Sequence, residues 1–239
     1  MSIANYAHYA QRQVRPEILG FIVFAVTNTM LSFLLLQMKG IRHNAMIVGM
    51  LWFTGGLGSW LTAVLEYMNG NNLGFAVFAS FGAYYFSFAT TMTPAFGLEA
   101  AYVNTDESNN AIAILFLSWS FLFLLFVVVG IRTNLVLVGI FVSVTVTAVC
   151  VSASHFLAAM HQNKISIKLE KIAGICLILG SLAGWYNVAH LLFKDQGFSF
   201  VLPLGDLKPT RVVQIEEVNQ TNILNTPMTN EEATTIHTL

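Results

Sequence analysis

Six long apolar segments, separated by short polar stretches, dominate the chain. A helix that crosses a membrane needs about 20 apolar residues, because each residue rises about 1.5 Å through about 30 Å of hydrocarbon. Six segments meet this requirement, and we expect helices at Ile18–Met38, Ala45–Met68, Leu73–Met92, Ala111–Ile131, Leu135–Phe156 and Ile172–Phe193. The pattern predicts an all-α polytopic membrane protein with six transmembrane helices in a domain that spans residues 18–206.

The two ends of the chain are more polar than this domain. Residues 1–17 form a polar N-terminal segment that lacks the basic-then-apolar order of a cleaved signal peptide. Residues 207–239 are rich in Asn, Thr and Glu, and we expect a disordered polar tail. Of the links between helices, only the third-to-fourth and fifth-to-sixth are long enough to form lids.

Composition supports a membrane location. Only 10% of the 239 residues are charged, whereas soluble domains contain about 25%. Between Ala45 and Leu98, Glu66 is the only Asp, Glu, Lys, Arg or His. A water-soluble surface cannot be built from such a sequence, so the lipid bilayer is an expected partner. The net charge of −1 excludes the basic surface that nucleic-acid binding requires.

The distribution of lysine and arginine weakly favours one orientation. If both termini are cytoplasmic, six of these residues lie inside, namely Arg12, Arg15, Arg132, Lys194, Lys208 and Arg211. Five lie outside, namely Lys39, Arg42, Lys164, Lys168 and Lys171. Under the positive-inside rule, this count predicts that both termini are cytoplasmic. We expect the plasma membrane as the location of the protein.

The most polar interruption is the stretch EYMNGNNLG, which begins at Glu66 and ends at Gly74. A charge within an apolar segment is costly and usually finds a partner inside the protein. Asn71 or Asn72 can cap the following helix, and Glu66 can accept hydrogen bonds from the same helix end, with Gly70 and Gly74 completing a structural turn. Alternatively, the asparagine amides and the helix N-terminus form a site for a small anion. Both interpretations stay open, and they are compatible.

Later segments contain three further polar or small-residue patterns. Ser143, Thr147, Cys150 and Ser154 share one face of the fifth helix, which indicates either local hydroxyl-to-carbonyl bonds or a weakly polar pathway. Asn187 and His190 are neighbours near the end of the sixth helix, either as an interfacial cap or as a vestibule site. Gly180 and Gly184 have the spacing of close helix packing.

Several of these motifs together resemble a known family. The stretch GNNLGFAVFASFGAYYFSF is similar to the signature G-N-T-F-G…F-x-S-Y-G-x-F-W of the acetate uptake transporter family, which includes bacterial acetate–succinate permeases and fungal acetate and ammonium transport proteins. The preceding E-Y, the earlier F-T-G-G-L-G and the later V-L-P-L-G-D also fit. The resemblance extends from about Pro16 to Asp206, and AGWYNVAHLL is closer to the fungal branch.

The resemblance implies a six-helix protomer, usually part of a homo-hexamer, with one pathway through each protomer. In the family a Phe, a Tyr and a Leu pinch this pathway, and the matching positions here are Phe24, Phe81 and Val144. Phe81 lacks the tyrosine hydroxyl, and Val144 is smaller than leucine. The family motif N-P-A-P-L-G-L corresponds to the degenerate stretch RPEILGF, which retains Pro16, Leu19 and Gly20.

These features predict a transporter or channel for small monocarboxylates such as acetate, which would move with a proton through an apolar constriction. We expect Asn71, Asn72, Asn187 and His190 at polar vestibules. Ammonia or ammonium export is the alternative substrate hypothesis. A membrane sensor or scaffold that recruits partners through Asn219–Leu239 is the alternative of another class. No HExxH, GxSxG or paired intramembrane aspartates occur, so we expect no enzyme activity, metal or cofactor.

Overall fold

The structure is a computed structural model that describes residues 14–41, 43, 45–102, 104–200 and 202–207. Six helices within this part of the chain are long and apolar enough to cross a membrane, which confirms the predicted all-α class and the number of spans. The tail, for which we expected disorder, lies outside the described residues except for Leu207. Most of the polar N-terminal segment lies outside them as well.

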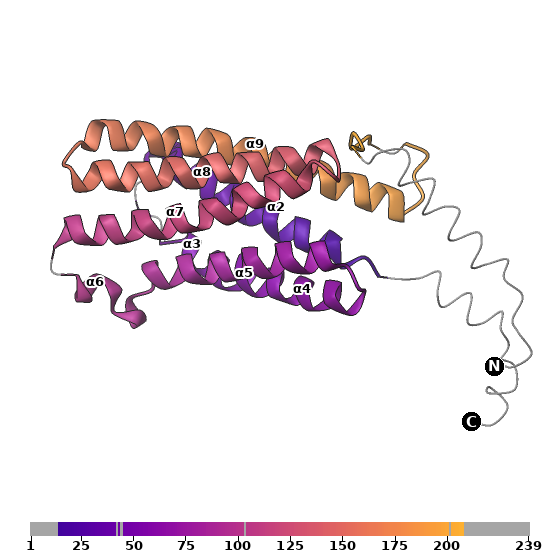
Figure 1. Cartoon of the computed structure of the whole chain (residues 1–239), viewed down its shortest axis with the longest axis horizontal. Helices are drawn as coiled ribbons and strands as arrows, with labels where there is room; N and C mark the ends of the chain where they lie inside the picture. Colours follow the sequence, from indigo (N-terminus) through magenta and orange to yellow (C-terminus); the bar gives the residue numbers. More distant parts are fainter. Residues whose placement is uncertain (1–13, 42, 44, 103, 201, 208–239) are drawn as a thin grey trace, which may run out of the picture.

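The six spans form an elongated bundle (Figure 1). In chain order they are α2 (Pro16–Leu35), a composite span of α3 (Ile47–Gly49), η2 (Met50–Leu57) and α4 (Gly58–Met68), then α5 (Asn72–Met92), α7 (Thr105–Gly130), α8 (Leu135–Ala159) and α9 (Asn163–Asp195). Three shorter helical turns lie in the links, namely η1 (Met38–Gly40), η3 (Pro94–Phe96) and α6 (Leu98–Ala101).

The helices enclose a common interior. Neighbouring helices around the bundle are α7 and α8, α8 and α9, and α9 and α2. The α2 helix in turn packs against α4, and α4 packs against α5. The backbones of α5 and α7 make few close contacts, and aromatic side chains fill the space between them. Phe81 stacks on Phe123 with ring centroids 5.1 Å apart, and Tyr84 and Phe88 meet Phe116 edge to face. Aromatic side chains therefore close the bundle interior between α5 and α7.

Asparagine side chains fix the beginnings of three spans. Asn71 caps α5, Asn104 caps α7 and Asn134 caps α8, each by accepting a hydrogen bond from a backbone N–H in the first turn. These donors have no partner within the helix, and an asparagine oxygen satisfies one of them. The α2 span instead begins with Pro16 at a position where a missing N–H costs nothing.

Several predicted boundaries were wrong. The first helix ends at Leu35 rather than Met38, because Gln37 and Lys39 adopt positive φ angles of 53° and 55°. The last helix begins at Asn163 rather than Ile172, so the link between the last two spans contains only residues 160–162 and cannot form the expected lid. The segment before Ile172 is charged but amphipathic, with Ser166 buried and its lysines exposed. A hydropathy criterion rejects such a segment although it is helical.

Two further differences concern helix length and regularity. The fourth predicted helix begins at Thr105 rather than Ala111, because its polar first turn is capped by Asn104. The fifth extends to Ala159 rather than Phe156. The second span contains the π-helical segment η2, which the apolar pattern does not reveal.

Candidate functional site

A polar turn connects α4 to α5 at one end of the bundle. Glu66 is 2% exposed, and its Oε2 accepts a hydrogen bond of 2.6 Å from Nδ2 of Asn71. Oδ1 of Asn71 accepts a hydrogen bond of 3.1 Å from the backbone N–H of Gly74. Oε1 of Glu66 makes no hydrogen bond within the described residues. The carboxyl group therefore reaches the start of α5 through the Asn71 amide, whereas the sequence suggested direct contact with backbone donors.

Two glycines make this turn possible. Gly70 has a φ of +71°, in the left-handed region that favours glycine. At Gly74 a Cβ atom would lie 2.6 Å from Nδ2 of Asn71 and 2.8 Å from Oε2 of Glu66. The hydrogen-bonded pair thus occupies the space that a side chain at Gly74 would need.

We expect Gly74→Ala to lower the free energy of unfolding by about 1–3 kcal/mol, because the new methyl group must separate the Glu66–Asn71 pair. Thermal unfolding in detergent measures this effect. Gly49→Ala is the matched control, since a Cβ there meets nothing within 4 Å. Equal unfolding midpoints for the two variants would contradict the tight packing of the turn.

The polar turn borders a cavity of about 680 Å³, which we call the near vestibule. Asn71, Asn187 and His190 line it, so the structure brings together two groups that lie more than a hundred positions apart in the chain. Asn187 is 4% exposed. Asn72 is the exposed first residue of α5 and is not part of the lining.

Three charged residues that the sequence analysis did not select also line the near vestibule. Arg15 and Glu17 come from the start of α2, and Lys194 comes from the last turn of α9. Their charge was visible in the sequence, but only the fold brings the two ends of the transmembrane domain to one cavity. Two cations against one carboxylate leave the lining with a net positive charge, which favours anions.

Residues 202–207, which contain the L-P-L-G-D stretch, fold back over the same end of the bundle. The backbone N–H of Leu135 donates to the carbonyl oxygen of Gly205 at 2.9 Å, and that of Leu207 donates to the carbonyl oxygen of Thr133 at 2.9 Å. His190 Nδ1 contacts the carbonyl oxygen of Leu202. Leu204 lines the near vestibule. The segment thus fixes one wall of the cavity and the ring of His190.

An aromatic contact lies deeper in the bundle. The rings of Phe24 on α2 and Phe81 on α5 meet edge to face, with centroids 5.4 Å apart. Both side chains are buried, at 5% and 4% exposure, and belong to the same apolar cluster as buried Val144 on α8. We call these three residues the waist. On its near side, a separate space of about 10 Å³ is lined by Phe24 and Phe81 together with Phe21 and Phe78, which leaves room for about one water molecule.

A second cavity of about 220 Å³ lies on the opposite side of the waist, and we call it the far vestibule. Its polar lining consists of Gln37, Thr91, His155 and Glu170. His155 Nδ1 lies 3.0 Å from Oδ1 of Asn109, and Ser154 Oγ donates to Oε1 of Glu170 at 3.3 Å. The sequence analysis did not select the four polar lining residues. Packed apolar and aromatic side chains separate the two vestibules.

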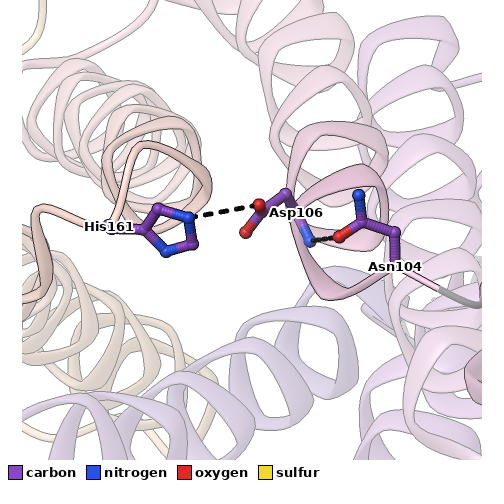
Figure 2. A network of polar contacts seen from close by, with 3 residues as sticks. All are labelled: Asn104, Asp106 and His161. Carbon is purple, nitrogen blue, oxygen red and sulfur yellow. Dashed lines mark hydrogen bonds and ion pairs between the residues drawn. The ribbon is translucent and has the colours of Figure 1, made fainter.

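The far end of the bundle also carries an exposed contact between a histidine and an aspartate. Nε2 of His161, just after α8, lies 3.4 Å from Oδ2 of Asp106 in the first turn of α7 (Figure 2). The backbone N–H of Asp106 donates a hydrogen bond to Oδ1 of the cap residue Asn104. His161 is 80% exposed. Exposed pairs of this kind contribute little to stability, and this pair lies outside the lining of the far vestibule.

Comparison with known proteins identifies the family. The family model described as "GPR1/FUN34/yaaH family" matches residues 2–208. The chain belongs to this family.

Relatives within the GPR1/FUN34/yaaH family include fungal proteins named for transport. The acetate transporter protein patA of Aspergillus clavatus is 33% identical over 192 residues, which cover 80% of this chain and 77% of the relative. PatA of Penicillium expansum is 33% identical over 195 residues, which cover 81% and 78%. The ammonia transport outward protein 2 of Saccharomyces cerevisiae is 25% identical over 192 residues, which cover 80% and 66%.

A solved structure shares the fold. The structure of the bacterial acetate channel SatP superimposes with a TM-score of 0.67 at 20% sequence identity, and the match covers 81% of this chain and 100% of that protein. The predicted resemblance is therefore confirmed. Together with the six spans, membership of the GPR1/FUN34/yaaH family makes this chain an integral membrane protein.

In this member of the family, the hydroxyl groups of the polar face of α8, formed by Ser143, Thr147, Cys150 and Ser154, contribute to helix packing. Ser143 Oγ donates to the carbonyl oxygen of Cys176, and Thr147 Oγ1 donates to that of Ala173 at 3.3 Å. Ser154 pairs with Ser166 at 2.9 Å. All three bonds join α8 to α9, so the expectation of hydroxyl-to-carbonyl bonds within α8 was wrong for these residues. Cys150 is free and partly buried.

Proposed function

We propose that this protein is a transporter or channel for small monocarboxylates such as acetate, which cross each protomer together with a proton. The observation that carries the proposal is the edge-to-face contact of Phe24 and Phe81 between the near and far vestibules. The names of the patA relatives agree with this substrate class.

The chemistry of the waist favours the protonated acid. A carboxylate that leaves water for an apolar constriction loses its hydration without a compensating partner, which costs far more than the transfer of the neutral acid. The near vestibule supplies such partners. Arg15 and Lys194 attract the anion, and the Asn71 and Asn187 amides offer hydrogen-bond donors. The anion therefore gathers at the vestibule, and the neutral acid passes the waist when the rings part.

We further propose that the protein resides in the plasma membrane with both termini in the cytoplasm, and that it forms a homo-hexamer. The even number of spans and the slight excess of lysine and arginine on the side of the termini support this orientation. The near vestibule, which is lined by residues from both ends of the transmembrane domain, would then face the cytoplasm.

Uptake of labelled acetate into liposomes that contain the purified protein tests the proposal. We expect the flux to fall as the external pH rises from 5 to 7.5, because the neutral fraction of a carboxylic acid drops about tenfold for each pH unit above its pKa. Protein-free liposomes give the background. A protein-dependent flux that is equal at both pH values would exclude transit of the neutral acid.

Ammonia movement is the second candidate, and the name of the Saccharomyces cerevisiae relative favours it. The sign of the internal pH change distinguishes the two substrates. Entering acetic acid releases a proton and acidifies the lumen, whereas entering ammonia takes up a proton and makes the lumen more alkaline. A luminal pH dye therefore identifies the substrate class in the same liposomes.

A further inference from the structure

The interior faces of α2 and α5 continue past the waist toward the far vestibule. On α2, Phe21 lines the near vestibule and Leu31 lines the far one, with Phe24 and Asn28 between them. On α5, the corresponding series is Phe78, Phe81, Tyr85 and Phe88. Steps of three and four residues keep each series on one helix face. Asn28 and Tyr85 therefore form a polar layer one helical turn beyond the waist.

This layer is deeply buried and hydrogen-bonded. Nδ2 of Asn28 donates to the hydroxyl oxygen of Tyr85 at 2.7 Å and to the carbonyl oxygen of Phe24 at 2.9 Å. Asn28 is 3% exposed and Tyr85 is 0% exposed. The carbonyl oxygen of Phe24 can only accept, so this contact identifies the amide nitrogen of Asn28.

The pair has one donor and one acceptor left over. Because Tyr85 accepts from Asn28, the hydroxyl hydrogen of Tyr85 is not used in their mutual bond, nor is Oδ1 of Asn28. Neither group makes another hydrogen bond to the residues that the structure describes. Polar groups are expensive within a membrane bundle and usually mark a pathway or find partners.

We propose that Asn28 and Tyr85 form a binding step for a neutral carboxylic acid in transit. The carbonyl oxygen of the acid accepts from the Tyr85 hydroxyl, and the acid hydroxyl donates to Oδ1 of Asn28. A carboxylate has no hydrogen to donate and would face Oδ1 with its negative charge. An ammonium ion has no acceptor for the Tyr85 hydroxyl. The step thus selects the uncharged acid over its anion and over the ammonium ion, and this inference rests on the proposed function.

The layer also distinguishes this chain from the family signature. The signature S-Y-G-x-F-W corresponds here to Ser80–Tyr85, with Phe81 at the tyrosine position and Tyr85 at the tryptophan position. The hydroxyl that Phe81 lacks is thus present one turn further along α5. Because Tyr85 is fully buried, an acid reaches it only when neighbouring rings move aside.

The test measures fluxes of acetic acid and of acetamide through the purified full-length protein in liposomes. Acetamide is a neutral isostere that also offers one carbonyl acceptor and a hydrogen-bond donor, and it carries no charge at either pH 5 or pH 7.5. We expect protein-dependent acetamide flux to be equal at both pH values, and acetamide to compete with acetic acid. Protein-free liposomes provide the background.

Tyr85→Phe is expected to lower both fluxes about tenfold, because passage then lacks one hydrogen bond at a site without water. Tyr84→Phe is the matched control, since it removes the hydroxyl of the neighbouring tyrosine outside this layer, and its fluxes should stay within about twofold of wild type. Asn28→Ala, which removes the acceptor, should reproduce the Tyr85→Phe result for both solutes.

Three outcomes separate this inference from the proposed function. Wild-type fluxes in well-folded Tyr85→Phe would overturn the binding step, and the pair would then only join α2 to α5. If the variants fail to fold, the wild-type protein still decides, because absence of acetamide flux and competition would also overturn the step. An acetate flux in wild type that is independent of pH would instead reject the proposed function itself.

Discussion

Replacement of Gly180 by leucine is expected to remove most of the stability of the α8–α9 pair. A Cβ atom at Gly180 would lie 2.2 Å from Oγ and 2.7 Å from Cβ of Ser143 on α8. The Cβ of Ser143 is fixed to its backbone, so a rotamer change cannot relieve the clash. A larger side chain must push the helices apart, which also breaks the hydrogen bond from Ser143 to the Cys176 carbonyl.

We expect this change to cost about 3 kcal/mol or more, from overpacking together with a buried hydroxyl left without its partner. For a chain of this size, that cost corresponds to a decrease of roughly 6–12 °C in the unfolding midpoint in detergent. Gly139→Leu is the control on α8, because a Cβ there meets nothing within 4 Å. If both variants unfold at the same temperature, close contact at Gly180 does not stabilise the bundle.

The spacing of Gly180 and Gly184 is compatible with close helix packing within a protomer or between protomers. Gly180 packs against Ser143 of α8, and a Cβ at Gly184 would lie 3.1 Å from the ring of Phe24 on α2. Both contacts are internal. Spacing identifies a face on which helices approach closely, but it carries no information about which helix approaches.

The spans were predictable because each depends on a local property, namely apolar length. The charged start of α9 and the π-helical η2 were missed, since helical structure there does not depend on an unbroken apolar run. Among the cap candidates, Asn71 rather than Asn72 accepts the hydrogen bond, and the sequence had offered both. A one-residue choice of this kind is decided by turn geometry, here by the positive φ of Gly70.

The candidate site was less accessible to prediction than the spans. Phe24 and Phe81 were selected through the family resemblance, and no local pattern brings them together. Their rings meet because side chains from α2 and α5 reach each other in the bundle interior, although the two helices are not close neighbours. Arg15 and Lys194 share a vestibule because the first and last spans are neighbours. The far vestibule combines Gln37, His155 and Glu170 from three segments of the chain. No motif or spacing in the sequence connects these three residues.

Opening the waist is expected to have the largest effect on transport. Phe24→Ala removes a ring that contacts Phe81 and merges its volume with the small space on the near side of the waist. A wider constriction admits water, and hydrophobic constrictions stop conducting mainly because they are dry. The hydrated anion then passes without a proton. We therefore expect flux at pH 7.5 to rise and the difference between pH 5 and pH 7.5 to shrink.

The size of this effect follows from the barrier to the anion. A decrease of about 1.4 kcal/mol raises the rate about tenfold, and we expect at least that increase at pH 7.5. Phe81→Ala should act in the same direction from the opposite side of the waist.

Phe121→Ala is the control, because Phe121 is 67% exposed and points away from the bundle interior. Phe24→Ala and Phe81→Ala each also lose about 3 kcal/mol or more of stability, because both rings are buried. Unfolding midpoints must therefore accompany the fluxes. Folded Phe24→Ala and Phe81→Ala proteins that keep the pH dependence of wild type would show that these rings do not control passage, since a barrier to charge cannot survive the loss of the groups that exclude water.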